Sequence, residues 1–544
     1  MKTKILLLLL ITIGMGACSN FDDMNTNNNK PSPDDPRFAD YDFNKAALSS
    51  ILRGGATYDG ADLWQRVKSL HIDLYSQMFD ESVSGWVSTR NYLRNDGWTV
   101  GYWSKVQQWV IRLNLIIKQG QGNPAKANSV AVAKIWRVYV QSQACDLFGV
   151  MPFPSYKLNE VNPPYVSVEN QYTEFFTELD AAAKLLDPKV GFMNGKEDMI
   201  FKGDVNKWKM FANSLRLRLA LRLSEVKPDV CKQQAQAAID GGVMTSASEE
   251  AKCPPSNVGW GNDYNYTLLF AWGETQHMTT SFEKLVTNIG GLDWPASYAA
   301  TVKPAKVDPR AVVMFNPSAS GFWKGVTPGL HPDNVNNGEN KASEKAILGT
   351  FVVGPAGQRN LSRPYDMLLF EEVCFLKAEA AARNFVTGVN AKAEYEKGVR
   401  SSFARWGATN VDAYLASTEK NVAGTSASYD DVAGAGNTVL EKIITQKYLA
   451  NFPDVSIEGW SDKRRLNLPR MDVPAYRDPS EFASAPSDIK NPRSFVKRVR
   501  IPLIESANNT VEYNKGVALM GPGGDKATTN IWWDVNANHC TSAN

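Results

Sequence analysis

Residues 208–220 read Trp-Lys-Met-Phe-Ala-Asn-Ser-Leu-Arg-Leu-Arg-Leu-Ala and lie at the centre of a helical pattern that covers residues 204–224. Apolar side chains recur there at intervals of three or four, which places them on one face of a helix. These apolar residues are Trp208, Phe211, Leu215, Leu219 and Leu223. Three arginines, Arg216, Arg218 and Arg222, fall on other faces. The stretch therefore predicts a helix with one side packed against a core.

Similar patterns occur on both sides of this helix. They cover residues 46–52, 63–79, 102–118, 125–148, 168–186, 228–240, 365–384, 391–406 and 438–452. Short connections join many of them, as in stacked helical hairpins of the tetratricopeptide kind. No clean 34-residue repeat is visible, so any such repeats are degenerate. We predict a mostly α fold built on a degenerate tetratricopeptide-like scaffold of about four helix pairs.

Residues 243–363 have a different character, because proline, glycine and asparagine become frequent and helical periodicity weakens. Long irregular regions in compact proteins are usually functional. We therefore predict a loop-rich ligand-binding region that packs on the scaffold. The predicted organisation is a signal peptide (1–17), a lipidated flexible tether (18–40), the first part of the scaffold (41–242), the irregular insertion (243–363), the second part of the scaffold (364–470) and a loop-rich C-terminal segment of the same domain (471–544).

The first residues have the pattern of a secretory signal. Lys2 and Lys4 precede an apolar run at residues 5–13, and small residues lead to Cys18. The run is too short to span a bilayer, which takes about 20 apolar residues. A cysteine directly after the small residues is typical of a bacterial lipoprotein, in which Cys18 is lipidated. The alternative is an ordinary cleaved signal with an incidental cysteine.

Charge and cysteine usage exclude several classes of function. Without residues 1–17, basic and acidic residues are equal in number, whereas nucleic-acid-binding proteins usually carry a basic stripe. The later cysteines are scattered without the spacing of zinc sites, so we expect no metal and no cofactor. Cys231 and Cys253 flank a helical segment and either form a disulfide or remain free. Cys145 and Cys374 lie in apolar helical stretches and are expected in the core.

Aromatic residues are abundant, with 15 Trp and 19 Tyr against 4 His. They concentrate in residues 58–103 and 253–323. A sugar ring packs its C–H face on an aromatic plane and needs placed polar partners for its hydroxyls, which is the usual composition of small-ligand sites. Trp64 and Trp103 lie in helical patterns and are expected in the core. The candidate ligand-binding residues, which lie in or beside predicted loops, are Trp86, Tyr92, Arg94, Asp96, Trp98, Trp260, Tyr264, Tyr266 and Trp323.

Five stretches in chain order carry a resemblance to a known family. They are residues 133–152, which end in Phe-Gly-Val-Met-Pro; residues 208–220; residues 371–381, which read Glu-Glu-Val-Cys-Phe-Leu-Lys-Ala-Glu-Ala-Ala; residues 446–469, which include Gly-Trp-Ser-Asp-Lys-Arg-Arg; and residues 500–534, which hold Arg-Ile-Pro and Trp-Trp-Asp. Together they resemble the SusD/RagB family, and the chain is most similar to its second SusD-like branch. Asp462 stands where the family commonly has Glu.

The resemblance implies an outer-membrane lipoprotein that faces the cell exterior, is held by its lipid alone, and binds a nutrient for a SusC-like TonB-dependent barrel. The aromatic residues favour a glycan ligand, and peptide capture is the alternative. We expect no enzymatic activity. A glycoside hydrolase, which needs two carboxylates across a sugar bond, is a remote alternative, because Glu371, Glu372 and Glu379 more simply form a solvated or salt-bridged helix face. Motif residues such as Trp532 are expected to be structural.

Overall fold

The computed structural model describes residues 43–81, 94–152, 162–255, 276–349, 351, 363–475 and 495–535. From Leu48 onward the described residues belong to one compact unit, and the account below concerns that unit. Trp86, Tyr92, Trp260, Tyr264 and Tyr266 lie outside the described residues, as do the predicted signal peptide and tether.

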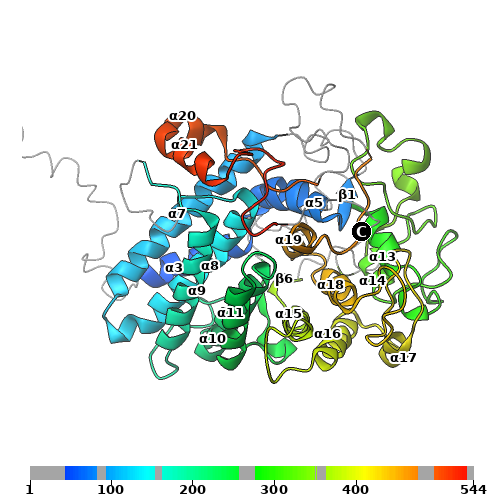
Figure 1. The fold of residues 1–544 in the computed structure, drawn as a ribbon, viewed down its shortest axis with the longest axis horizontal. Coiled ribbons are helices and arrows are strands. Elements are labelled where there is room, and N and C mark those ends of the chain that lie inside the picture. Colours follow the sequence, from blue (N-terminus) through cyan, green and yellow to red (C-terminus); the bar gives the residue numbers. More distant parts are fainter. Residues whose placement is uncertain are drawn as a thin grey trace, which may run out of the picture. The chain divides into compact units, whose positions relative to one another are not determined.

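Helices make up most of the described chain (Figure 1). Those of its first half are α3 (Phe43–Ala56), α4 (Ala61–Leu63), the π-helix η2 (Trp64–Asp73), α5 (Leu74–Ser76), α7 (Asp96–Gly120), α8 (Ala127–Phe148), α9 (Val168–Leu185), α10 (Val205–Arg222) and α11 (Pro228–Asp240). Those of its second half are α13 (Thr280–Val286), α14 (Ala311–Met314), α15 (Phe370–Ala382), α16 (Ala391–Trp406), α17 (Val411–Ala416), α18 (Val439–Ala450), α19 (Ser456–Leu466), α20 (Leu503–Asn508) and α21 (Thr510–Leu519).

Side-chain caps mark where several of the scaffold helices begin. Asp204 accepts hydrogen bonds from the backbone N–H groups of residues 206 and 207 at the start of α10. Thr438 and Glu441 form a capping box at the start of α18. Successive helices pack pairwise, as α7 does with α8, α10 with α11 and α15 with α16. The predicted mostly α, tetratricopeptide-like fold is confirmed.

Short strands lie mainly within residues 251–348, with β1 in the first half of the scaffold and β6 at the start of the second. They are β1 (Phe79–Glu81), β2 (Ala251–Cys253), β3 (Gln276–Met278), β4 (Phe315–Asn316), β5 (Ile347–Leu348) and β6 (Tyr365–Leu368). One antiparallel sheet has the order β1-β3-β5-β4, and β2 pairs with β6. The four-stranded sheet therefore joins residues near position 80 to the irregular insertion.

Helix α10 is buried on more sides than its sequence indicates. Trp208, Phe211 and Leu215 lie in the core as predicted. Arg218 and Arg222 are buried too, and each is neutralised, since Arg218 contacts Glu372 at 2.6 Å and Arg222 contacts Glu458 at 2.8 Å and Asp146 at 3.0 Å. A buried charge is tolerated only when it is paired and hydrogen-bonded.

The resembling stretches converge on this buried network of charges. Lys447 contacts Asp462 at 3.0 Å, and Arg465 contacts Asp462 at 2.9 Å and Glu379 at 2.6 Å. Figure 1 shows α10, α15, α18 and α19, which supply many of these residues, close together in the fold. The salt-bridged interpretation of the α15 carboxylates is confirmed. The solvated interpretation is wrong, because Glu371, Glu372 and Glu379 are all fully buried.

The described cysteines are all buried, and none of them forms a disulfide with another described cysteine. Cys145 and Cys374 lie in the core as predicted, and Cys231 and Cys253 are not joined. Burial raises the pKa of the Cys231 thiol to about 12 and that of Cys253 to about 11. These thiols are therefore packing groups rather than nucleophiles.

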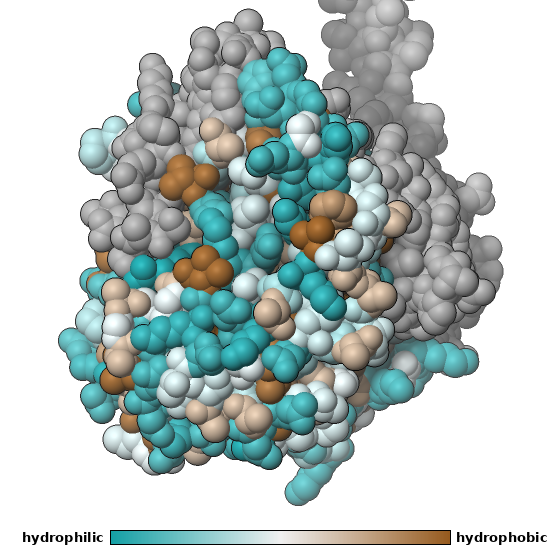
Figure 2. All heavy atoms as spheres, turned by 90° about the vertical axis from the view of Figure 1, so that its right-hand side faces the viewer, coloured by the Kyte–Doolittle hydropathy of each residue, from teal (hydrophilic) through white to brown (hydrophobic). Residues whose placement is uncertain are grey.

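The side of the molecule on the right in Figure 1 faces the viewer in Figure 2. Polar residues cover most of its coloured surface, and hydrophobic residues appear there as separate small groups. Isolated surface hydrophobic residues are normal and do not indicate a docking area. Within the described ranges, no helix combines the length and apolar character needed to cross a bilayer.

Candidate functional site

The two aromatic-rich segments predicted to bind ligand join the fold at one pair of residues. Glu81 ends β1 and directly precedes residues 82–93, and Gln276 begins β3 and directly follows residues 256–275. Glu81 and Gln276 are register partners in the antiparallel β1–β3 ladder. Residues 82–93 therefore begin, and residues 256–275 therefore end, at the same end of the same sheet.

This sheet end is a rigid support. Asp80, next to Glu81, is buried and its Oδ2 accepts a hydrogen bond of 2.9 Å from the backbone N–H of Gly329. Below it, Phe79 packs on Phe315 and Phe452 with ring centroids 5.9 and 5.1 Å away. Loops that carry binding residues typically project from such a scaffold.

Arg94 and Asp96 hold the other end of the first segment. Arg94 Nη2 donates to Asp96 Oδ1 at 2.8 Å and to the backbone carbonyl of Ile501 at 2.7 Å. Asp96 Oδ1 also accepts from the backbone N–H of Leu503 at 2.9 Å. The structure therefore brings these two predicted site residues together. Their polar atoms hold the start of α7 in place. A direct contact of either residue with a ligand stays a prediction.

Trp98 follows in the first turns of α7 and is half-buried. Its ring lies edge-on to the imidazole of His71, with centroids 6.1 Å apart. His71 is buried, and burial lowers its pKa to about 4, so the imidazole is neutral near pH 7. Trp98 thus combines a fixed orientation with partial exposure, which suits an aromatic surface for a ligand.

Two further contacts fix the ends of such segments, and we call each fixed end a root. One lies just before residues 256–275, and the other lies just after residues 352–362. Arg53 Nη1 donates to the backbone carbonyl of Pro254 at 3.1 Å. Arg363 Nη2 donates to Asp454 at 2.5 Å and to Asp366 at 3.0 Å. Burial opposes ionisation of Asp366, but Arg405 and Arg363 outweigh it and hold its pKa below the ordinary value. The ionised carboxylate therefore keeps this root fixed.

The segment at residues 476–494 starts beside α13. Asp472 accepts hydrogen bonds of 2.6 Å from Thr280 Oγ1 and from Lys284 Nζ. The backbone N–H of Ala475 donates to the carbonyl of Pro328 at 2.8 Å. Because α13 directly follows β3, Asp472 is held by the helix that comes next in the chain after Gln276 and its strand.

Trp323 is a correction to the sequence analysis, which placed it in an accessible loop. The residue is fully buried, its Nε1 donates to the carbonyl of Phe315 at 2.9 Å, and its ring packs edge-on against Trp294. Backbone bridges at Phe322 and Val326 draw the segment inward. Its indole is not a stacking surface for a ligand. Trp64 and Trp103 are core residues, as predicted.

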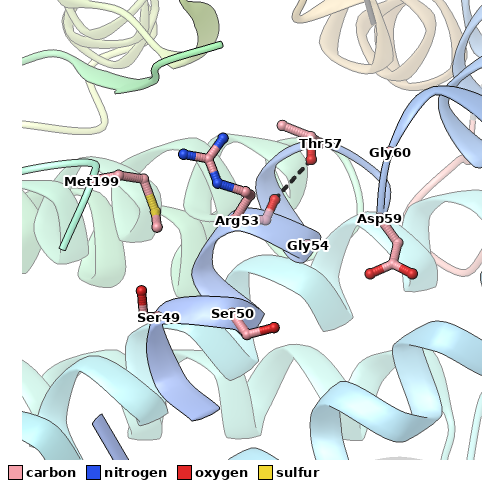
Figure 3. Close-up of a pocket in the computed structure, with 8 residues that line it drawn as sticks. All are labelled: Ser49, Ser50, Arg53, Gly54, Thr57, Asp59, Gly60 and Met199. Atoms are coloured by element: carbon pink, nitrogen blue, oxygen red, sulfur yellow. Dashed lines mark hydrogen bonds between the residues drawn. The ribbon is translucent and has the colours of Figure 1, made fainter. Parts of the chain in front are cut away.

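A small polar pocket lies beside the Pro254 root and was not predicted (Figure 3). Its volume is about 220 Å³, and it is lined by Ser49, Ser50, Arg53, Gly54, Thr57, Asp59, Gly60 and Met199. Asp59 has a left-handed backbone with φ of 62° and contacts Lys105 at 2.6 Å. Hydroxyl groups on helix α3 gave no signal in the sequence, because isolated serines are common on helix surfaces.

Nearly the whole chain matches one protein family. The family described as SusD-like, "Susd and RagB outer membrane lipoprotein", matches residues 23–534, and the chain belongs to this family. The predicted family is therefore confirmed. No curated protein matches the chain.

Solved structures show the same fold. A SusD homologue from Parabacteroides distasonis is 46% identical with a TM-score of 0.85, over 92% of this chain and 100% of that one. A chitin-binding SusD homologue from Flavobacterium johnsoniae is 25% identical with a TM-score of 0.75, over 91% and 100%. A SusD homologue from Bacteroides vulgatus, 24% identical with a TM-score of 0.74 over 92% and 99%, shares the fold.

Proposed function

We propose that the protein is a surface-exposed outer-membrane lipoprotein that binds a glycan and delivers it to a SusC-like TonB-dependent transporter. The observation that carries the glycan proposal is the pairing of Glu81 with Gln276, since it joins two tryptophan- and tyrosine-rich segments to one sheet end. Aromatic planes with a few placed polar groups suit sugar rings. The chitin-binding relative from Flavobacterium johnsoniae supports a glycan as the ligand class.

The proposed ligand-contacting residues are those that the sequence analysis named, without Trp323. They are Trp86, Tyr92, Arg94, Asp96, Trp98, Trp260, Tyr264 and Tyr266. Trp98 would present its exposed part to the ligand, and Arg94 and Asp96 would keep the root of the first segment in place. Membership of an outer-membrane lipoprotein family supports lipidation of Cys18, with residues 18–40 as a tether. One acyl chain anchors a protein only marginally, and further chains make the anchor stable.

Calorimetry tests the ligand class. The Cys18→Ala protein is titrated with chitohexaose, maltohexaose, xylohexaose and a set of hexapeptides. We expect saturable binding of at least one oligosaccharide, and Trp98→Ala weakens it about tenfold, or ~1.4 kcal/mol. Tyr429→Ala, which changes a partly exposed aromatic packed on Tyr395, is the matched control and retains affinity. Tight peptide binding without any glycan binding would overturn the proposal in favour of peptide capture.

Cell fractionation tests the anchor and the partner separately. Cys18→Ala should abolish retention on the cell surface and leave glycan binding in solution intact. The lipidated protein should copurify from gently solubilised outer membranes with a large β-barrel. Repeated isolation of the lipoprotein alone would contradict the transporter partnership without affecting the glycan proposal.

A further inference from the structure

A groove of about 530 Å³ lies on the helical scaffold, with a lining separate from the roots described above. Helices α9, α10 and α11 form its walls, and Trp532 from the C-terminal segment completes it. The residues that carry the argument are Phe176, Arg216, Gln233, Gln234 and Trp532. Its volume lies within the range of about 300–1,000 Å³ that is typical of small-ligand sites.

Two hydrogen bonds hold Arg216 in position and leave its Nη2 without an acceptor among the described residues. The residue is only 8% exposed. Its Nε donates to Gln234 Oε1 at 2.8 Å, and its Nη1 donates to Asp180 Oδ1 at 3.0 Å. Among the described residues, no acceptor contacts Nη2, although Arg216 lines the groove. Nη2 is not among the buried unsatisfied atoms, so it is open to the groove, where it can donate to water or to a bound ligand.

Trp532 differs from the neighbouring motif tryptophan. Trp533 is fully buried, and its Nε1 donates to Asp146 at 3.0 Å. Trp532 is only half-buried, and within the described chain its indole forms no ring contact or hydrogen bond. The segment itself is rigid, because Asp534 contacts Lys497 at 2.7 Å. The structural role expected for Trp532 stays a prediction, and the exposed part of its indole lines the groove.

The charges around the groove cancel locally. Glu169 contacts Lys227 at 3.0 Å, and Asp180 contacts both Lys184 at 2.6 Å and Arg216 at 3.0 Å. Long-range attraction needs an excess of one sign, so the groove does not favour a charged ligand. An aromatic face, a fixed N–H donor and the exposed amide of Gln233 together match a neutral ring with oxygen acceptors.

We propose that this groove is a second saccharide-binding site, distinct from the loop-borne site. The C–H face of one neutral sugar residue lies on Trp532, a hydroxyl or acetamido oxygen accepts from Arg216 Nη2, and Gln233 bonds a further hydroxyl. The proposal does not depend on the loops, because every residue named here lies on the scaffold or the C-terminal segment.

Fluorine NMR of protein labelled with 5-fluorotryptophan tests the site. Trp532→Phe assigns the resonance of Trp532, and Trp98→Phe assigns that of Trp98. The probes are chitohexaose, cellohexaose and maltohexaose, with hexaalanine as the peptide. We expect one oligosaccharide to shift the Trp532 resonance saturably, and Gln233→Ala to weaken this response about tenfold. Lys232→Ala, on the same helix and outside the groove lining, leaves the response unchanged.

Two outcomes overturn the inference. One is a Trp532 resonance that responds to no oligosaccharide or only to hexaalanine, and the other is a response that persists after Thr177→Trp fills the groove. The Trp98 resonance separates the two proposals. A shift of Trp98 without Trp532 supports the loop-borne site alone, and a shift of Trp532 without Trp98 supports the groove alone.

Discussion

Arg465 in α19 donates two hydrogen bonds of 2.6 Å each to the two carboxylate oxygens of Glu379 in α15. Both side chains are fully buried, and Asp462 also accepts from Arg465 at 2.9 Å. Burial opposes ionisation of Glu379, but Arg465 outweighs it and holds the pKa of the carboxyl below its ordinary value. This bidentate pair connects helices that are 86 residues apart at the contact.

Glu379→Gln should destabilise the protein by about 3–5 kcal/mol, because it leaves the buried guanidinium of Arg465 incompletely neutralised. The double variant Glu379→Leu with Arg465→Met should recover most of that loss, since it removes both buried charges. Urea unfolding gives the free energies. Lys515→Ala breaks an exposed pair with Glu512 and should change stability by less than ~1 kcal/mol. An unchanged Glu379→Gln protein would show that the pair does not stabilise the fold.

The pH dependence of stability should include a contribution from His71. Burial lowers its pKa to about 4 in the fold, against about 6.5 in the unfolded chain. A base with a lowered pKa stabilises the fold fully above pH 6.5, and this stability is lost as pH falls toward 4. The difference corresponds to about 3 kcal/mol. His71→Asn should flatten the curve of unfolding free energy between pH 6.5 and 4, as measured by urea unfolding at a series of pH values.

Close packing of α15 on α16 requires Gly398. A Cβ at this position would lie 2.8 Å from two ring carbons of Phe375, which is fully buried. Gly398→Ala should therefore destabilise the protein, because overpacking costs about 1–3 kcal/mol and outweighs the ~1 kcal/mol gain in helix propensity. Gly191→Ala, where no atom lies within 4 Å, is the control and should change the melting temperature little. Equal melting temperatures for both variants would contradict the packing argument.

Local pattern predicted most of the scaffold. Apolar periodicity around Trp208 located α10, because a one-sided apolar stripe reports burial directly. The burial of the Arg218 and Arg222 side chains was not predictable, since charged residues are normally exposed. Their partners, Glu372 and Asp146, lie on other helices, and no local pattern reports contacts at that separation.

The candidate site was predictable in composition and only partly in position. The pairing of Glu81 with Gln276 depends on strand register between distant segments, and three-residue strands carry almost no periodic signal. Trp323 shows the opposite failure. Glycines on both sides indicated a loop, although backbone bridges bury the indole. Trp532 belonged to a motif, and the exposure of its ring became visible only in the groove.

The described thiols should be unreactive in the folded protein. Burial raises the pKa of Cys231 to about 12 and that of Cys253 to about 11, and the thiolate is the reactive form. Iodoacetamide at pH 8 should label both residues only after denaturation, as judged by peptide mass spectrometry, and dithiothreitol should not change the melting temperature. A disulfide-linked peptide containing both cysteines would contradict this expectation.

Asp472 should affect ligand binding more than folding. It fixes the chain just before residues 476–494 by accepting from Thr280 and Lys284, and both donors belong to the helix that follows β3. Asp472→Ala removes both acceptors at a partly exposed position, so the unfolding free energy should fall by only about 1–2 kcal/mol. If the loop-borne site binds the glycan, a loosened root should weaken binding severalfold in calorimetry. Asp412→Ala, which breaks an exposed contact with Arg400, is the matched control and should retain full affinity. Equal affinities for the two variants would mean that this root does not position the binding loops.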